Sequence, residues 1–133
     1  MKVFLLAAGL GRRLLPLTAS KPKCLIDIGG KPLLSWHVEK LKSLRIDHLI
    51  INLFHEGEQI ENFLGDGSKW GINIEYFYEK ELLGTGGGIG NALNSIGNEP
   101  FIVISGDVWT DFDLSNLSLI EGCLLYTSDA ADE

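Results

Sequence analysis

The sequence predicts an α/β fold in which a mostly parallel sheet is flanked by helices. Short uninterrupted apolar runs alternate along the chain with segments whose apolar residues recur at helical spacing. This alternation is typical of strands that are buried on both faces and joined by crossover helices. The chain has 133 residues, of which 45% are hydrophobic, and this length and composition suit one compact domain.

The first half of the chain contains two predicted strands and two predicted helices. Residues 3–8 form an apolar run that predicts the first strand, and residues 48–53 predict the second. Between them, residues 32–44 carry apolar side chains at helical spacing after Pro32, a residue that suits the first turn of a helix. The apolar residues of segment 60–64 mark the second helix.

The second half begins with a strand of a different kind. Residues 72–78 alternate so that one face is consistently apolar, which predicts a strand near the edge of the sheet. A glycine-rich turn at residues 84–90 is expected to lead into a helix that ends near Ile96. Residues 101–104 predict the fourth strong strand, which ends at Ser105-Gly106-Asp107.

Charge is distributed unevenly along the chain, whose formal net charge is −7. Residues 1–45 contain nine Lys and Arg against two acidic residues, so we expect this basic third to meet an anion, although a solvated face would also account for its charges. The overall acidity argues against a nucleic-acid partner. No apolar run approaches the ~18 residues of a transmembrane helix, so no membrane partner is expected either.

Cysteine and histidine residues give no sign of a metal site. Cys24 and Cys123 lie 99 positions apart without a CxxC pair, which supports neither a zinc site nor a disulfide scaffold. His37, His48 and His55 show no mutual spacing for a metal or a catalytic pair. We therefore expect a protein of the reducing cytoplasm, in which Cys24 is a small buried apolar residue.

A glycine-rich segment follows the first predicted strand. The glycines of residues 9–13 would let backbone N–H groups approach a phosphate, and the alternative is an ordinary strand-to-helix turn. The segment is not a dinucleotide-binding fingerprint, because Leu14 stands where the third glycine belongs. Gly30-Lys31 does not form a Walker loop, since Pro32 replaces the required Ser or Thr.

The glycine segment continues as the string GLGRRLLPLTASKPKCL at residues 9–25. This string resembles the signature of the sugar-1-phosphate nucleotidylyltransferases, in which a glycine loop with an arginine at its end is followed by P-x-T and then by P-K. LGTGGGI at residues 83–89 resembles the family's base-binding turn, and SGDVWTD at residues 105–111 resembles its metal-binding strand end. The resemblance runs from Met1 to about residue 117.

The resemblance implies a Rossmann-like nucleotidyltransferase fold whose carboxy-terminal half is truncated in this chain. Residues 1–120 are interpreted as the nucleotide-binding half, and residues 121–133, which match nothing in the family, as a non-native or disordered tail. The absent half is expected to carry the sugar-binding strands, a lysine for the sugar phosphate and a second metal-binding aspartate. We therefore expect an inactive fragment, and its oligomeric state stays open.

The resemblance also implies a reaction. A sugar 1-phosphate attacks the α-phosphorus of a nucleoside triphosphate, and pyrophosphate leaves in line without a covalent enzyme intermediate. Within the family the sequence is most similar to the N-acetylmuramate 1-phosphate uridylyltransferases, which implies UTP as substrate and a place in cell-wall peptidoglycan recycling. The mannose-1-phosphate guanylyltransferases and glucose-1-phosphate thymidylyltransferases are the alternatives.

The family signature assigns roles to three charged residues. Arg13 is expected to bind the departing pyrophosphate with its planar fork, and Lys23 to bind the α-phosphate or the incoming sugar phosphate. Asp107, at a strand end, is expected to hold Mg²⁺ against the triphosphate. Asp111 and Asp113 are expected to cap a helix that begins near residue 114 instead.

A second group of residues is expected to contact the nucleotide. Glu79 and Gly84 are assigned to the base by the same resemblance, and backbone atoms after the first strand to the ribose. Arg12 is expected to be more solvated than Arg13. The residues expected to contact the substrates are Leu6, Ala8, Gly9, Gly11, Arg12, Glu79, Gly84 and Thr85.

Two other functions stay open on the sequence. A non-catalytic nucleotide-sensing module would keep the fold without turnover, although the presence of Arg13, Lys23 and Asp107 argues against it. A dinucleotide-dependent oxidoreductase would need an acidic residue at the end of the second strand, where Asn52 and His55 stand.

Overall fold

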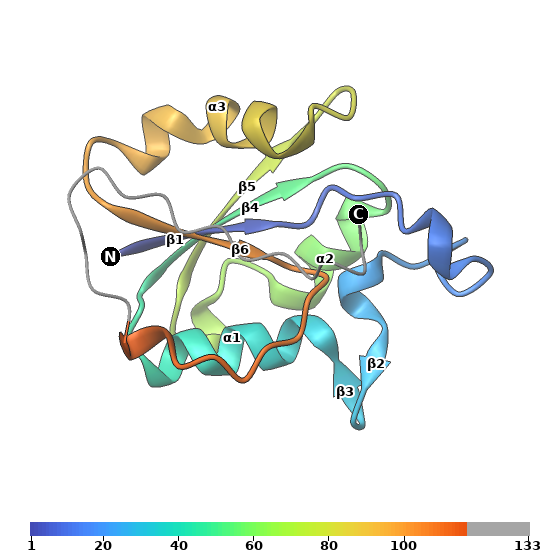
Figure 1. Cartoon of the computed structure of the whole chain (residues 1–133), viewed down its shortest axis with the longest axis horizontal. Coiled ribbons are helices and arrows are strands. Elements are labelled where there is room, and N and C mark those ends of the chain that lie inside the picture. Colours follow the sequence, from blue (N-terminus) through green and yellow to red (C-terminus); the bar gives the residue numbers. More distant parts are fainter. Residues whose placement is uncertain (117–133) are drawn as a thin grey trace.

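A four-stranded sheet with helices on both faces forms the body of the protein in a computed structural model, which describes residues 1–116 (Figure 1). The strands are β1 (Lys2–Leu6), β4 (His48–Leu53), β5 (Asn73–Tyr78) and β6 (Phe101–Ser105). They stand in the order β5-β4-β1-β6, and each neighbouring pair is parallel. The predicted parallel α/β fold is therefore confirmed.

Burial differs between the central and the outer strands. The central strands β1 and β4 are buried on both faces, because nearly every residue in them is apolar. β5 lies at one edge, as predicted, and its alternation leaves Ile74 buried and Asn73 exposed. β6 lies at the other edge of the described sheet, and all five of its residues are partly exposed.

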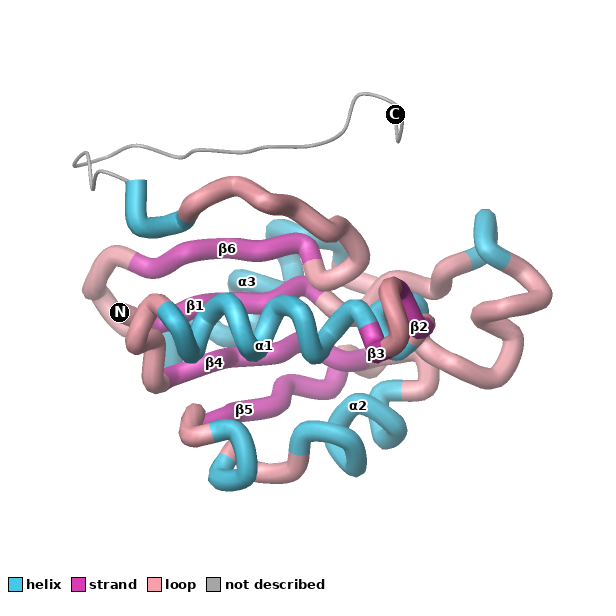
Figure 2. Tube along the Cα trace, turned by 90° about the horizontal axis from the view of Figure 1, so that it is seen from below, coloured by secondary structure: helices cyan, strands magenta, loops and turns pink. Residues whose placement is uncertain are grey.

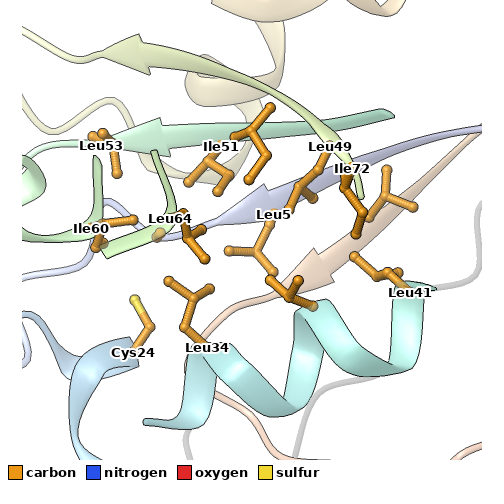
Figure 3. Packing of buried hydrophobic residues seen from close by; sticks show 14 of the residues in the cluster. Leu5, Cys24, Leu34, Leu41, Leu49, Ile51, Leu53, Ile60, Leu64 and Ile72 are labelled. Carbon is orange, nitrogen blue, oxygen red and sulfur yellow. The ribbon is translucent and has the colours of Figure 1, made fainter. Parts of the chain in front are cut away.

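Three α-helices of residues 1–116 cover the sheet. They are α1 (Leu33–Ser43), α2 (Gly57–Leu64) and α3 (Gly84–Ile96). The view from below shows α1 and α2 on the near face of the sheet, with α3 behind it (Figure 2). Leu34 and Leu41 of α1 point toward the strands in the larger apolar cluster, and Leu41 lies below Ile72 (Figure 3). The cluster under α3 consists of Phe4, Ile50, Ala92 and Ile96.

The glycine-rich segment after β5 differs from the prediction. Residues 84–90 were expected to form a turn, but α3 already begins at Gly84. Gly88 faces two buried polar side chains: a Cβ atom there would lie 2.7 Å from Asn52 Nδ2 and 2.8 Å from Glu79 Oε1. Glycine has a low intrinsic helix propensity, but this close tertiary packing requires glycine at position 88 of the helix.

Two short features complete the described chain. Residues 27–28 (β2) and 31–32 (β3) form an antiparallel hairpin that the sequence analysis did not predict. At the carboxyl end, Asp113 Oδ1 accepts a hydrogen bond of 2.9 Å from the backbone N–H of Ser115, as expected of a residue that caps a helical turn. The tail interpreted from the sequence, residues 121–133, lies outside the described residues.

Because all four strands are parallel, their carboxyl ends lie at the same edge of the sheet. The chain leaves β1 through α1 on one face and enters β6 through α3 on the other face (Figure 1). Ligands of open α/β sheets bind at the carboxyl ends of the strands, where the strand order reverses. That point lies at the end of β1. None of the helices in residues 1–116 is long and apolar enough to cross a membrane.

Candidate functional site

A cavity of about 410 Å³ lies at the carboxyl ends of β1, β4 and β6. It is lined by each of the eleven residues that the sequence analysis assigned to catalysis, substrate or metal. Further lining residues are Ala7, Leu10, Leu14, Cys24, Asn52, Leu82 and Ser105. Segments that are separated by up to 101 positions, from Leu6 to Asp107, therefore meet around one space.

The glycine loop after β1 is held by Thr18, the threonine of the P-x-T string. Gly11 has a φ of +63°, and a Cβ atom there would come 2.8 Å from Thr18 Cγ2. Thr18 is 1% exposed, and its hydroxyl donates a hydrogen bond of 2.5 Å to the Gly11 carbonyl oxygen. The Thr18 carbonyl oxygen lies 3.0 Å from Nε2 of His55. The signature therefore includes a residue that shapes the loop from behind the cavity.

Cationic side chains form one wall of the cavity. Arg12 and Arg13 are exposed on a 3₁₀ turn that directly follows Gly11. Lys23 begins a second 3₁₀ turn, which follows Pro22 in an extended conformation. Both arginines line the cavity with Lys23, so the structure brings three positive charges next to the glycine loop. Such a wall favours a ligand with several negative charges.

Asp107 lies next to Lys23 and accepts hydrogen bonds from two side chains. Lys23 Nζ lies 2.8 Å from Asp107 Oδ2, and Ser105 Oγ donates to Asp107 Oδ1 at 2.6 Å. Partial burial acts to raise the pKa of Asp107, but the hydrogen bonds from Lys23 and Ser105 outweigh it and hold the pKa below its usual value. Asp107 is therefore a carboxylate at neutral pH.

The donor set around Asp107 can be compared with the needs of Mg²⁺. Within residues 1–116 no group of three or more His, Cys, Asp or Glu side chains is arranged to hold a metal ion. Mg²⁺ is commonly held by one or two carboxylates, with water and substrate phosphates as the other ligands. A single carboxylate beside a cationic wall fits an ion that arrives with a phosphorylated substrate. Lys23 occupies Oδ2, so it would have to move to expose that oxygen.

Glu79 and Asn52 form a buried polar pair on the other side of the cavity. Glu79 is 6% exposed and Asn52 is 2% exposed. Asn52 Nδ2 donates to Glu79 Oε1 at 2.9 Å, and Asn52 Oδ1 accepts from the backbone N–H of Ala7 at 2.8 Å. The second oxygen of Glu79 accepts from the backbone N–H of Leu83 at 3.2 Å. The carboxylate that the sequence assigned to a base thus has protein donors on both of its oxygens.

Sequence reasoning assigned no site role to Asn52. It considered this position only as evidence against a dinucleotide site. The available signal was a polar residue near the end of an otherwise apolar strand, in the string LIINL of β4. A buried amide at such a position needs hydrogen-bond partners, and the structure supplies them from the residue after β1 and from the residue after β5.

Helix α1 supports the segment that carries Asp107. Lys40 Nζ donates hydrogen bonds to the carbonyl oxygens of Thr110, at 3.1 Å, and Phe112. His37 is 6% exposed beneath this segment. Burial lowers the pKa of His37 and outweighs the opposite effect of its hydrogen bond to the Gly106 backbone, so the imidazole is neutral. The sequence analysis gave His37 no catalytic role, and here it packs behind the site.

Cys24 lines the cavity from below. It is 3% exposed, and burial raises the pKa of its thiol to about 12. A protonated thiol is a weak nucleophile. The described geometry therefore favours a packing role for Cys24, as the sequence analysis expected, rather than covalent chemistry.

Comparisons with known proteins agree on one family. Residues 2–119 match the family model described as nucleotidyl transferase. The N-acetylmuramate alpha-1-phosphate uridylyltransferase of Neisseria meningitidis serogroup B is 48% identical over 116 residues, which are 86% of this chain and 50% of that protein. The mannose-1-phosphate guanylyltransferase of Mycobacterium tuberculosis is 38% identical over 112 residues, which are 84% of this chain and 31% of that protein.

A solved structure shows the same fold. HddC from Yersinia pseudotuberculosis, complexed with GMP-PN, matches with a TM-score of 0.75 and 34% identity over 86% of this chain and 51% of that chain. The chain thus spans about half the length of these relatives, or less.

The Lys23–Asp107 contact gives a prediction for titration. Lys23→Gln removes the cation, so partial burial should then dominate and the pKa of Asp107 should rise. Because the folded pKa is lowered, the pair stabilises the fold above the unfolded pKa of Asp107, and this stabilisation is lost as pH falls through the folded pKa. Carbon-detected NMR of the Asp107 carboxyl group measures the shift directly. Lys21→Gln is the matched control, and an unchanged Asp107 titration in Lys23→Gln would contradict the prediction.

Proposed function

The chain belongs to the nucleotidyl transferase family, and we propose that it is the nucleotide-binding half of an enzyme that transfers a nucleoside monophosphate from a nucleoside triphosphate to a sugar 1-phosphate. The observation that carries this proposal is the single cavity whose lining brings Arg12, Arg13, Lys23 and Asp107 together with the glycine loop. A triphosphate needs such a cationic wall, and backbone N–H groups of a glycine loop suit its oxygens.

The proposed reaction needs little acid–base chemistry from the protein. An oxygen of the sugar 1-phosphate forms a bond to the α-phosphorus, and the bond from the α-phosphorus to the β-phosphate oxygen breaks to release pyrophosphate. Phosphate monoesters lose their second proton near pH ~6, so the nucleophile is already an anion. The protein's task is to align two anions and to neutralise charge that develops on the leaving group.

The charged side chains divide this task. Arg13 is proposed to hold two oxygens of the departing pyrophosphate, because its guanidinium forms a planar fork. Lys23 is proposed to leave Asp107 and bind the α-phosphate or the sugar phosphate as a compact charge. Asp107 would hold Mg²⁺, which when bound supplies further neutralisation of the triphosphate.

The nucleoside is proposed to lie at the opposite end of the cavity from Asp107. Gly84 and Thr85 line that end, with Glu79 beneath them. Similarity to the Neisseria uridylyltransferase, at 48% identity, favours UTP and N-acetylmuramate 1-phosphate, and hence a cytoplasmic role in the recycling of cell-wall sugars. The Mycobacterium guanylyltransferase, at 38%, supports GTP and mannose 1-phosphate as the alternative.

A substrate panel tests the proposal in the full-length protein. Pyrophosphate release should be fastest with UTP and N-acetylmuramate 1-phosphate, judged by kcat/KM. A higher value with GTP would move the protein to the guanylyltransferase branch. If no triphosphate and sugar 1-phosphate release pyrophosphate, the proposed function is wrong. The 133-residue chain should bind UTP weakly in isothermal titration and give no turnover.

Adjacent arginines give a second prediction. In the full-length protein Arg13→Ala should lower kcat/KM by about 10²-fold, because a preorganised charge contact to the leaving group is lost. Arg12→Ala is the matched control, since it removes the same charge from the neighbouring position and should have a much smaller effect. Equal losses in the two variants would mean that the loop acts only as a basic surface.

The metal role of Asp107 gives a third prediction. Asp107→Asn keeps the size of the side chain and removes its charge, so turnover at saturating Mg²⁺ should fall about 10²-fold or more. Mn²⁺ binding in the presence of UTP, followed by electron paramagnetic resonance, should weaken in parallel. Asp111→Asn is the control from the same segment. Near-normal turnover and Mn²⁺ binding in Asp107→Asn would place the metal on other residues.

A further inference from the structure

A continuous chain of hydrogen bonds runs through three residues that line the cavity and joins two backbone segments. It runs from the backbone N–H of Ala7 to the amide of Asn52, from that amide to the carboxylate of Glu79, and from the carboxylate to the backbone N–H of Leu83. Ala7 leads into the glycine loop, and Leu83 directly precedes the start of α3 at Gly84. The two backbone segments are thus linked through two side chains.

The direction of every hydrogen bond in this chain is determined. Both backbone groups are donors, so the Asn52 amide must present its oxygen to Ala7 and its NH₂ group to Glu79. A carboxylate accepts at both oxygens, and Glu79 uses one for Asn52 and the other for Leu83. Both side chains are more than nine-tenths buried. A flip of the Asn52 amide would set its NH₂ group against the Ala7 N–H and its oxygen against Glu79, which would leave buried groups without partners and is unfavourable.

Helix α3 packs closely against the pair. A Cβ atom at Gly88 would lie within 2.8 Å of both polar groups, so the backbone of α3 presses directly on them. Leu6 of β1 is paired with Asn52 of β4 in the sheet register, which fixes the amide from the other side. A change in the pair should therefore move the segment at Leu83 rather than be absorbed locally.

We propose that Asn52 is a positioning residue for the nucleoside end of the cavity, where it acts through Glu79 to fix the first turn of α3, which carries Gly84 and Thr85, relative to the glycine loop. This inference rests on the proposed function, because it takes that end of the cavity to bind the nucleoside. It assigns Glu79 an indirect role: the carboxylate orients the turn, and its charge is not required by the base.

A swap of the two polar groups tests the proposal in the full-length protein. Asn52→Asp keeps the acceptor for Ala7 but sets two carboxylates against each other, and Glu79→Gln removes one of two needed acceptors. Each single change should raise the KM for UTP about tenfold, the effect of one unsatisfied buried group. In the double variant the new glutamine amide donates to the new carboxylate and accepts from Leu83. Every hydrogen bond is restored, and the KM should return to within about twofold of wild type.

Two further measurements separate positioning from general stability. The KM for the sugar 1-phosphate and the affinity for inorganic tripolyphosphate, measured by titration, should change by less than about twofold in the single variants, since neither ligand uses the nucleoside end. Ile50→Val is the matched control: it alters a fully buried residue on the same strand and face. It should lower the melting temperature without a selective change in the KM for UTP.

The outcomes distinguish this inference from the proposed function. No pyrophosphate release by the wild-type protein refutes the function, whereas UTP and tripolyphosphate titrations still report on the pair. A double variant that keeps the defect of Glu79→Gln would mean that the Glu79 carboxylate contacts the nucleotide itself, and would overturn the inference. Equal losses for UTP and tripolyphosphate, or a double variant that does not fold, would reduce the pair to a stability role and overturn it as well.

Discussion

The burial of β1 on both faces is the constraint on which the candidate site depends. Val3, Phe4 and Leu5 are fully buried, with Phe4 toward α3 and the other two toward α1. Polar side chains are excluded from such a strand because their burial without partners is costly. Polar groups that can bind a ligand therefore lie beyond the end of its apolar run. Parallel pairing then sets Leu6 opposite both Asn52 and Ser105. The polar residues of three distant segments meet at one edge as a consequence of this register.

The two polar pairs at that edge, Asn52–Glu79 and Lys23–Asp107, differ in burial. Asn52 and Glu79 are buried, so their hydrogen bonds must be complete and their geometry is fixed. Lys23 and Asp107 keep 29% and 40% of their side chains exposed, and an ion pair of this kind contributes about 1 kcal/mol or less. A weak pair can exchange partners when a polyanion arrives. In the function that we propose, the fixed Asn52–Glu79 pair would hold the shape of the nucleoside end of the cavity. The weak Lys23–Asp107 pair would rearrange around the phosphates.

Much of the fold could be predicted because buried parallel strands leave uninterrupted apolar runs in the sequence. The bounds predicted for β4 agree with the structure, and β5 lies at the edge that its alternation indicated. The motif residues also gather around one cavity, although their roles stay predictions. The helical start of α3 was not predicted, because a run of glycines has low helix propensity, and the packing that requires glycine at position 88 involves two side chains distant in the sequence. The pairing of Asn52 with Glu79 could not be predicted from the sequence either, because it joins positions 27 residues apart.

The contrast between β1 and β6 connects the packing to the proposed function. The string FIVIS of β6 is as apolar as the string KVFLL of β1, yet every residue of β6 is partly exposed. An apolar strand at an open edge favours association with another strand, so β6 has the sequence of an interior strand in an outer position. Asp107 follows this strand directly. In the longer protein that we propose, chain packed against β6 would lie beside Asp107, on the side of the cavity away from the nucleoside turn.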